Sequence, residues 1–314
     1  MSEASSENPA DARSDARLLT SRHVLLLAAL TFFWGMNWSV MKIGVRELPP
    51  LWFRFLGLLL GCAVLYLYAR LRGIGLGVAR RHWSRIALLA LPNMIIWYLV
   101  AIIAIAMLPS GRAALLAYTM PIWAALIGAF FLGERLALRT WFGVASALAA
   151  TVLLVAGEWD ALAGRPLGVA LMLFAAASWG AGTHLLRRMP LAVDTLVLTF
   201  WMMALTTVVL LGASWLFERA AWEWPHGLQW LPILYNAVFV LGLCNVLWFA
   251  LARSLPPVAS GLSGMLIPVV GVCSGMVLLG EAPVLGDIVA LLLILFALAT
   301  VVWPARVRAV GPRP

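Results

Sequence analysis

The chain has 314 residues, of which 64% are hydrophobic and only 11% are charged, with a formal net charge of +9. Soluble domains carry roughly 25% charged residues, so this composition excludes an ordinary soluble protein. The basic residues lie between apolar runs, where membrane topology accounts for them better than nucleic-acid binding does. The three cysteines lie in apolar runs without motif spacing and predict neither a disulfide framework nor a metal site.

In chain order, residues 1–23 are polar and of mixed charge, which predicts a disordered cytoplasmic tail. A retained first span follows, and a C-terminal cytoplasmic tail covers residues 304–314. A helix crosses a bilayer with about 20 apolar residues. The sequence predicts an all-α integral membrane protein with ten such helices, at 24–45, 51–69, 86–107, 110–132, 137–156, 166–186, 194–216, 231–252, 257–279 and 284–303.

Two segments 147 residues apart are variants of one another, Leu108–Glu134 and Leu255–Glu281. They align without a gap, and the landmarks that coincide are an initial Leu-Pro and the pairs Pro121 and Pro268, Gly128 and Gly275, and Glu134 and Glu281. The dipeptide Trp34-Gly35 is echoed by Trp179-Gly180. The chain is therefore predicted to be two five-helix repeats, residues 24–156 and 157–303. An odd number of spans per repeat inverts the second repeat, an arrangement that points to a transporter.

The orientation of the bundle is predicted from its arginines. With the N-terminus inside, sixteen arginines fall in cytoplasmic segments and four in external ones. Because cytoplasmic loops are enriched in Lys and Arg, both termini are expected in the cytoplasm. The predicted location is the inner membrane of a bacterium.

The duplicated prolines, glycines and glutamates are candidates for helix hinges, close helix packing and gates. A mid-span proline lacks an N–H and crowds the carbonyl four residues earlier, so Pro121 and Pro268 predict either a hinge in each repeat or a static kink. Gly128 and Gly275 belong to small-xxx-small pairs that let helices approach closely. Glu134 and Glu281 follow a glycine and fit helix-end chemistry, with latches on opposite gates as the alternative.

Aromatic and polar residues recur on the faces of several spans. On the first span, Trp34, Trp38 and Lys42 are spaced by four, with Asn37 beside them. Other spans contribute Asn93, Trp97, Tyr98, Tyr118, Thr119, Trp179, Thr183, His184, Asn245 and Trp248. Such residues suit a pocket for a small, partly apolar metabolite. The alternative is interhelical packing and hydrogen bonding, which uses the same residue types.

Two cations flank the first external loop. Lys42 and Arg54 could hold a substrate carboxylate, because ionisable groups inside a membrane are usually functional. The alternatives are snorkelling to the interface or pairing with Glu47. Every acidic residue lies in the tail, in a loop or at a span end. The sequence therefore predicts neutral or zwitterionic substrates, moved by facilitated transport, by exchange or by a coupling that uses no mid-span carboxylate.

The chain resembles the EamA-type branch of the drug/metabolite transporter superfamily. The resemblance rests on FFWGMNWSVMKIG in the first span, on the arginine in PPLWFRFLGLLL and on the two blocks that end in Leu-Gly-Glu. It implies two inverted five-helix repeats, a central cavity, alternating access and export of amino acids or other small metabolites. The second repeat departs from the first where WGAGTHLLRR replaces WGMNWSVMK.

The expected function is export of small neutral or zwitterionic metabolites such as amino acids. Lipophilic drugs or other metabolites are the alternative cargo, and a channel or an intramembrane enzyme is the alternative class. No HExxH, GxSxG or Walker motif is present, so no catalytic residue, metal or cofactor is expected. The expected partners are the substrate and the bilayer, without nucleic acid. A monomer and a homodimer are both compatible with the sequence.

Overall fold

The computed structural model describes residues 21–160, 166–247 and 257–302. The regular secondary structure in this part of the chain is entirely helical, with no strand. The first unit comprises α1 (Ser21–Glu47), α2 (Pro50–Leu71), η2 (Arg80–His82), α3 (Trp83–Ala90), η3 (Leu91–Ile95), α4 (Ile96–Met107), α5 (Ser110–Ala117), α6 (Met120–Leu132) and α7 (Leu138–Asp160). The second comprises α8 (Pro166–Arg188), α9 (Thr195–Glu218), η4 (Arg219–Ala221), η5 (Gly227–Gln229), α10 (Trp230–Tyr235), η6 (Asn236–Cys244), α12 (Pro257–Leu279) and α13 (Leu285–Val302).

Most of these helical segments have the length and composition of membrane spans. Seven segments are long and apolar enough to cross a bilayer, namely Ser21–Glu47, Pro50–Leu71, Arg80–Met107, Ser110–Leu132, Pro166–Arg188, Thr195–Ala221 and Gly227–Leu247. Three shorter apolar helices, Leu138–Leu154, Gly264–Leu279 and Leu285–Thr300, lie where the fifth, ninth and tenth spans are expected. The prediction of a helical, multi-span bundle is confirmed, while the number of ten crossings stays a prediction.

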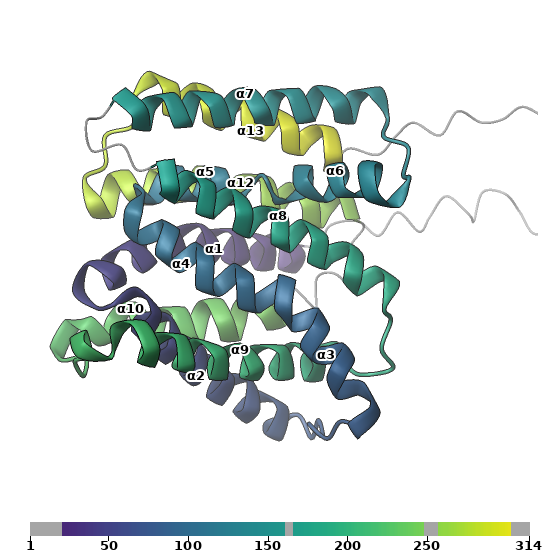
Figure 1. The fold of residues 1–314 in the computed structure, drawn as a ribbon, viewed down its shortest axis with the longest axis vertical. Helices are drawn as coiled ribbons and strands as arrows, with labels where there is room; N and C mark the ends of the chain where they lie inside the picture. The colour runs from purple at the N-terminus through teal and green to yellow at the C-terminus, as the bar shows by residue number, and fades with distance from the viewer. Residues whose placement is uncertain (1–20, 161–165, 248–256, 303–314) are drawn as a thin grey trace, which may run out of the picture.

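The helices pack in pairs that relate one unit to the other (Figure 1). The last helices of the two units, α7 and α13, pair at one edge of the bundle, and the second helices, α2 and α9, pair at the opposite edge. Between these edges, α1 packs on α12, while α8 packs on α5 and α6. The first helix of each unit therefore lies against the duplicated segment of the other unit.

The glycines of the repeated Trp-Gly dipeptide, Gly35 and Gly180, lie at these helix crossings. A side chain at Gly35 would collide with Val270 of α12, and one at Gly180 would collide with the backbone of α6 at Ala124. Without a Cβ, each glycine lets the two helices approach closely. The repeated Trp-Gly dipeptide thus lies at equivalent helix contacts in the two units.

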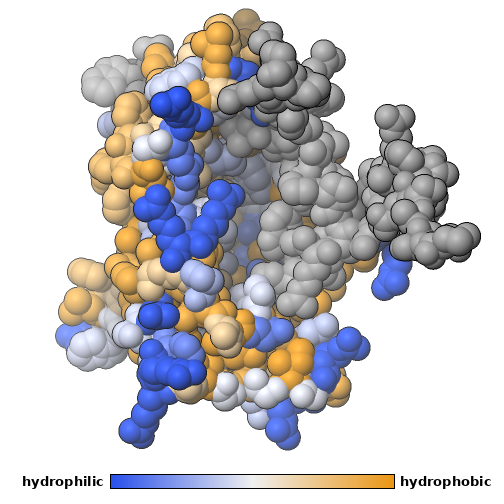
Figure 2. Space-filling view, turned by 90° about the vertical axis from the view of Figure 1, so that its right-hand side faces the viewer, coloured by the Kyte–Doolittle hydropathy of each residue, from blue (hydrophilic) through white to orange (hydrophobic). Residues whose placement is uncertain are grey.

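The connections fall at two ends of the bundle. One end, called here the Glu134 end, holds the start of α1, the end of α13 and the connections that follow α2, α6 and α8 (Figure 1). Figure 2 looks onto this end and shows hydrophilic side chains across it, with hydrophobic surface on its flank. Arginines 70, 72, 80, 81, 135, 187 and 188 lie in these connections or beside them. The opposite end, the Glu281 end, holds the connections that follow α1, α4, α9 and α12. The arginine bias predicts that the Glu134 end faces the cytoplasm.

Two segments are π-helical where the sequence predicts ordinary helix, η3 in the first unit and η6 in the second. In η3, Pro92 cannot donate a backbone hydrogen bond, and its carbonyl accepts from Ser178 Oγ at 3.0 Å. The side chain of Asn93 donates to the carbonyls of Leu89 at 2.8 Å and Gly182 at 3.3 Å. Polar residues of α8 and η3 thus satisfy the backbone where the helix is widened.

The duplicated prolines behave differently in the two units. The helix of the first unit is interrupted at Tyr118 and Thr119, within one turn before Pro121, and divides into α5 and α6. The hydroxyl of Thr119 donates to the carbonyl of Leu116 at 2.6 Å, which stabilises the turn. In the second unit, α12 continues through Pro268. Identical proline chemistry therefore gives a break in one repeat and an uninterrupted helix in the other.

The glycine contacts predict a stability difference between two substitutions of the same kind. Gly35→Ala should lower the free energy of unfolding by about 1–3 kcal/mol, because its methyl group overpacks the contact with α12. A methyl group added at Gly212 in α9 would meet no atom within 4 Å, so Gly212→Ala should be neutral or stabilising by about 0.5–1 kcal/mol. Unfolding of both variants in mixed micelles measures the difference. Equal stability of the two variants would contradict the close contact of α1 and α12.

Candidate functional site

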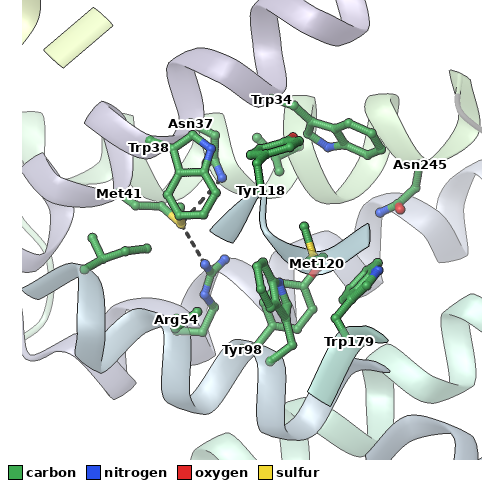
Figure 3. A pocket seen from close by; sticks show the side chains of 14 residues that line it. Trp34, Asn37, Trp38, Met41, Arg54, Tyr98, Tyr118, Met120, Trp179 and Asn245 are labelled. Carbon is green, nitrogen blue, oxygen red and sulfur yellow. Dashed lines mark hydrogen bonds between the residues drawn. The ribbon is translucent and has the colours of Figure 1, made fainter. Parts of the chain in front are cut away.

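A cavity of about 150 Å³ lies between the two units, and is called here the central cavity (Figure 3). Aromatic side chains make up much of its wall, with two amides and a single charged group among the described lining residues. The lining residues are Trp34, Asn37, Trp38, Met41, Arg54, Trp97, Tyr98, Ala101, Ile105, Tyr118, Met120, Trp179, Val240 and Asn245. They come from α1, α2, α4, the α5–α6 break, the start of α6, α8, η6 and the helical residues that follow η6.

The first helix presents Trp34, Asn37, Trp38 and Met41 to this cavity. These positions follow the i, i+3, i+4, i+7 pattern of one helix face. A spacing of four drifts by about 40° per step around a helix with 3.6 residues per turn, which carries Lys42 away from the face. The ammonium group of Lys42 instead donates to the carbonyls of Ile105 at 2.9 Å and Ala106 at 3.0 Å. Lys42 therefore caps the C-terminal end of α4, where a cation suits the helix dipole.

Arg54 is the charged residue of the central cavity and is 3% exposed. Its Nη1 donates to Asn236 Oδ1 at 2.9 Å, and its Nη2 contacts the sulfur of Met41 at 2.7 Å. The guanidinium carbon lies 4.8 Å from the ring centre of Tyr98. Asn236 in turn donates to Asn37 Oδ1 at 2.6 Å, so two amides fix the orientation of the arginine.

A second cavity of about 420 Å³, the vestibule, lies on the Glu134 side of the first. The two cavities share Tyr118, Met120 and Trp179. The other residues that line the vestibule are Pro121, Ala124, Ala125, Glu134, Leu136, Thr140, Thr183, His184 and Arg187. The vestibule therefore links the central cavity to the Glu134 end of the bundle.

A histidine and a glutamate meet on the vestibule wall. The Nε2 of His184 lies 2.7 Å from the carbonyl oxygen of Ala124, and its Nδ1 lies 3.6 Å from Glu134 Oε1. The Glu134 side chain is 49% exposed. A side chain at Gly128 would collide with this carboxylate, so the glycine makes room for Glu134 to fold back toward α8.

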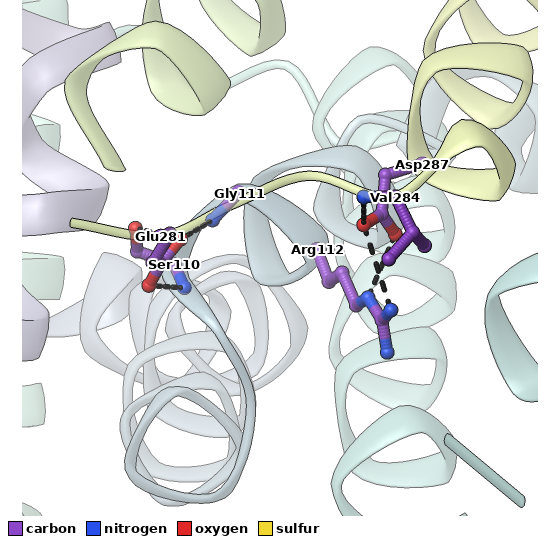
Figure 4. Close-up of polar contacts among 6 residues, drawn as sticks. All are labelled: Ser110, Gly111, Arg112, Glu281, Val284 and Asp287. Atoms are coloured by element: carbon purple, nitrogen blue, oxygen red, sulfur yellow. Dashed lines mark hydrogen bonds and ion pairs between the residues drawn. The ribbon is translucent and has the colours of Figure 1, made fainter. Parts of the chain in front are cut away.

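The duplicated glutamate at the other end is held tightly (Figure 4). Glu281 accepts hydrogen bonds from Ser110 N at 2.7 Å, Ser110 Oγ at 3.0 Å and Gly111 N at 3.1 Å. A carboxylate at the start of a helix satisfies unpaired N–H groups and suits the helix dipole. Beside it, Arg112 Nε lies 2.7 Å from Asp287 Oδ1. Glu281 and Asp287 thus tie the start of α5 to the connection between α12 and α13 and to the first turn of α13.

A further carboxylate closes the same end. Glu218, at the end of α9, accepts from the backbone N–H groups of Leu51 at 3.0 Å and Trp52 at 2.9 Å. The indole of Trp52 stacks on that of Trp222 with 4.3 Å between ring centres. Among the described residues, no connection at the Glu281 end lines either cavity. The two cavities therefore lead toward the Glu134 end.

The structure brings most of the predicted site residues together. Nine of them line the central cavity, and Thr183, His184, Pro121 and Glu134 line the vestibule. Lys42, Asn93 and Thr119 line neither cavity and instead bond to backbone carbonyls. The duplicated glycines Gly128 and Gly275 each make room for a glutamate carboxylate. The predicted residue Trp248 lies outside the described residues.

Several residues of the site were not predicted. Met41 could have been found from the helix face that Trp34, Asn37 and Trp38 define. Asn236 gives no local signal, because a single amide near the start of a span is equally compatible with a structural role. The apolar wall residues Ala101, Ile105, Met120 and Val240 cannot be told from lipid-facing or packing residues by sequence alone.

Two helical units that pack in related pairs around a cavity have the architecture of a secondary transporter. The model of the EamA-like transporter family matches residues 21–156 and 166–303, so the chain belongs to this family and is a multi-pass membrane transporter. The predicted family is confirmed. Family membership argues against an enzyme at the level of the family.

Named relatives agree with this class. YoaV, an uncharacterized transporter of Bacillus subtilis, is 26% identical over 86% of this chain and 93% of its own length. A probable amino-acid metabolite efflux pump of Salmonella typhimurium is 28% identical over 88% and 93%. The aromatic amino acid exporter YddG of Ancylobacter novellus is 27% identical over 67% and 74%. A crystal structure with a TM-score of 0.64 and 22% identity covers 88% of this chain and 94% of its own, which shows the shared fold.

The two duplicated glutamates predict unequal contributions to stability. Glu281→Ala should cost about 2–4 kcal/mol of unfolding free energy, because it leaves the N–H groups at the start of α5 without their charged acceptor. Glu134→Ala at the equivalent position should cost less than about 1 kcal/mol, because its half-exposed carboxylate makes one long contact. Unfolding of both variants in one detergent measures the difference. Equal losses of unfolding free energy in the two variants would contradict the difference between the contacts of Glu134 and Glu281.

Proposed function

We propose that the protein exports small zwitterionic metabolites with an apolar part, such as amino acids, by alternating access between its two repeats. The observation that carries this proposal is the aromatic central cavity, which contains one cation and reaches one end of the bundle through the vestibule. Ligand pockets of this kind combine apolar walls with a few placed polar groups.

The walls suit the two parts of such a molecule. Trp97 and Trp179 lie edge to face with 5.3 Å between ring centres and offer an apolar surface. Asn245 uses its Nδ2 to donate to the carbonyl of Leu241 at 2.6 Å, which leaves its oxygen as an acceptor for an ammonium group. Aromatic faces also attract cations. The names of the relatives from Salmonella typhimurium and Ancylobacter novellus support amino acids as the cargo.

The asymmetry of the two repeats supports alternating access. In an inverted pair of repeats, one conformation gives the two repeats different shapes, and the opposite conformation exchanges those shapes. The first repeat is broken before Pro121 and leaves Glu134 half exposed. The second runs through Pro268 and holds Glu281 on the start of α5. We infer that the opposite conformation straightens α5 and α6 and bends α12 at Pro268.

The arginine bias supplies a direction for this conformation. With the Glu134 end in the cytoplasm, the cavities face inward, which is the state that receives a substrate for export. The energy source is proposed to be exchange or the substrate gradient, because no carboxylate lines the central cavity among the described residues. The pair of His184 and Glu134 is the place to look if a proton gradient drives transport.

Uptake of radiolabelled amino acids into proteoliposomes tests the proposed function. Saturable uptake of a neutral or aromatic amino acid is expected, and unlabelled amino acid on the far side should accelerate it. Trp179→Ala should raise KM about tenfold, because it removes apolar contact area from both cavities. The matched control is Trp141→Ala on the lipid-facing side of α7, which should leave KM unchanged.

Three outcomes of this experiment carry different meanings. Absence of uptake across the amino acids would overturn the amino-acid proposal. Equal KM values for the two tryptophan variants would contradict the central cavity as the binding site. Accumulation driven by a pH gradient would contradict the predicted coupling and direct attention to His184.

The proposed orientation can be tested by labelling from one side of the membrane. In a variant whose three native cysteines are replaced by serine, Thr140→Cys places a thiol in the vestibule and Leu228→Cys places one at the exposed Glu281 end. A membrane-impermeant maleimide should label position 228 in intact cells and position 140 only in inverted vesicles. Labelling of position 140 in intact cells would reverse the orientation.

A further inference from the structure

The proposed function uses the charge of Arg54 without assigning that charge a partner. The side chain is buried one turn into α2, near the Glu281 end of the central cavity, and points into the space among the aromatic residues (Figure 3). A cation removed from water normally pairs with a carboxylate, because leaving it without one is strongly unfavourable. Among the described residues, Arg54 forms no ion pair.

The described groups that touch Arg54 are all neutral. Asn236 accepts one hydrogen bond through its amide oxygen, Met41 contributes a weakly accepting sulfur, and Tyr98 offers its ring. The Nε of Arg54 is buried and has no hydrogen-bond partner. These contacts hold the guanidinium in place and leave its positive charge uncompensated.

The edge of the guanidinium formed by Nε and Nη2 is the part that lacks a strong acceptor. A carboxylate binds such an edge through two parallel hydrogen bonds. Nη1 is occupied by Asn236, so the arginine cannot rotate freely. Met41 covers Nη2 at present, and its flexible side chain can move aside when an oxygen takes its place.

Two other cations near this end show what a structural role looks like in this chain. Arg112 pairs with the carboxylate of Asp287. Lys42 binds two carbonyls at the negative end of α4. Within the described ranges, Arg54 has neither kind of partner, and it is the charged group among the residues that line the central cavity.

We propose that Arg54 binds the carboxylate group of the transported molecule, so that the protein selects carboxylate-bearing substrates over the corresponding amides and amines. This proposal rests on the proposed function and specifies its substrate class. The substrate carboxylate then supplies the missing negative charge at the deep end of the cavity. The apolar part of the substrate extends from there toward Trp179 and the vestibule.

Binding of four related compounds to the purified protein in lipid nanodiscs tests the proposal. L-phenylalanine and 3-phenylpropionate carry a carboxylate, whereas L-phenylalaninamide and phenethylamine do not. The wild type should bind the first two at least about tenfold more tightly, because a hydrogen bond to a charged group is the strong kind. Thermal stabilisation measures binding, and competition against phenylalanine uptake confirms it.

The variants separate binding from structural support. Arg54→Gln should abolish the preference for carboxylates, and Arg54→Lys should retain it in part, because lysine keeps the charge and loses the paired donors. The control Arg112→Gln should lower stability and leave the preference intact, since its partner is Asp287. If Arg54→Gln does not fold, the lysine variant still decides, because a purely structural arginine would leave the preference unchanged.

The outcomes distinguish this proposal from the proposed function. Equal binding of phenylalanine and its amide by the wild type, or a carboxylate preference that survives in Arg54→Gln, overturns the assignment of Arg54 while amino-acid uptake can persist. If the wild type takes up and binds none of the amino acids or the four compounds, both proposals fail together.

Discussion

The structure depends on one constraint, which is that backbone polar groups have no water to bond with inside a bilayer. Several backbone groups of the first unit bond to side chains of the second unit. Ser178 of the second unit bonds to the carbonyl at Pro92, and His184 bonds to the carbonyl at Ala124. At the Glu281 end, Glu218 and Glu281 bond to the first N–H groups of α2 and α5. These polar groups belong to the second unit and the backbone groups to the first, so the two repeats complete one another. Arg54 stands out because its charge has no carboxylate partner among the residues that the structure describes.

The sequence allowed the broad architecture to be predicted because duplication and hydrophobic length are visible in the residues themselves. The segment that ends in Glu134 and its copy that ends in Glu281 predicted two repeated units. The repeated Trp-Gly dipeptide lies at the two equivalent helix crossings. The aromatic wall was also predictable, since Trp34, Trp38 and Trp179 occur on spans that the repeats bring together. What the sequence could not show was the difference between copies of the same motif. Pro121 and Pro268 occupy equivalent places in the two copies, and only the packing of one conformation breaks the first helix while the second continues.

The two cations near the first connection show the same limit. The spacing of four in the sequence suggests that Lys42 lies on the same helix face as Trp34 and Trp38. In the structure, the helical twist turns the Lys42 side chain away from that face, and its ammonium group binds the end of α4. From the sequence, Arg54 could either hold a substrate carboxylate or serve as an anchor at the interface. Its place in the cavity depends on Asn236, which lies 182 residues later in the chain. A contact between residues so far apart in the sequence cannot be predicted from the residues around either one. The π-helical segments that contain Asn236 and Asn93 were likewise not predicted from the sequence.

The exchange of polar partners between the repeats has a consequence for how the protein is made. When the first repeat leaves the ribosome, the carbonyls at Pro92 and Ala124 and the N–H groups at the start of α5 do not yet have their partners. The helix α8 emerges first among the segments of the second repeat and brings Ser178 and His184 to the carbonyls of Pro92 in η3 and Ala124 in α6. Glu281 arrives last and closes the end where α5 begins. The order of synthesis therefore completes the contacts within η3 and α6 before those at the start of α5, and a chain that stops short of Glu281 lacks the charged acceptor at that end.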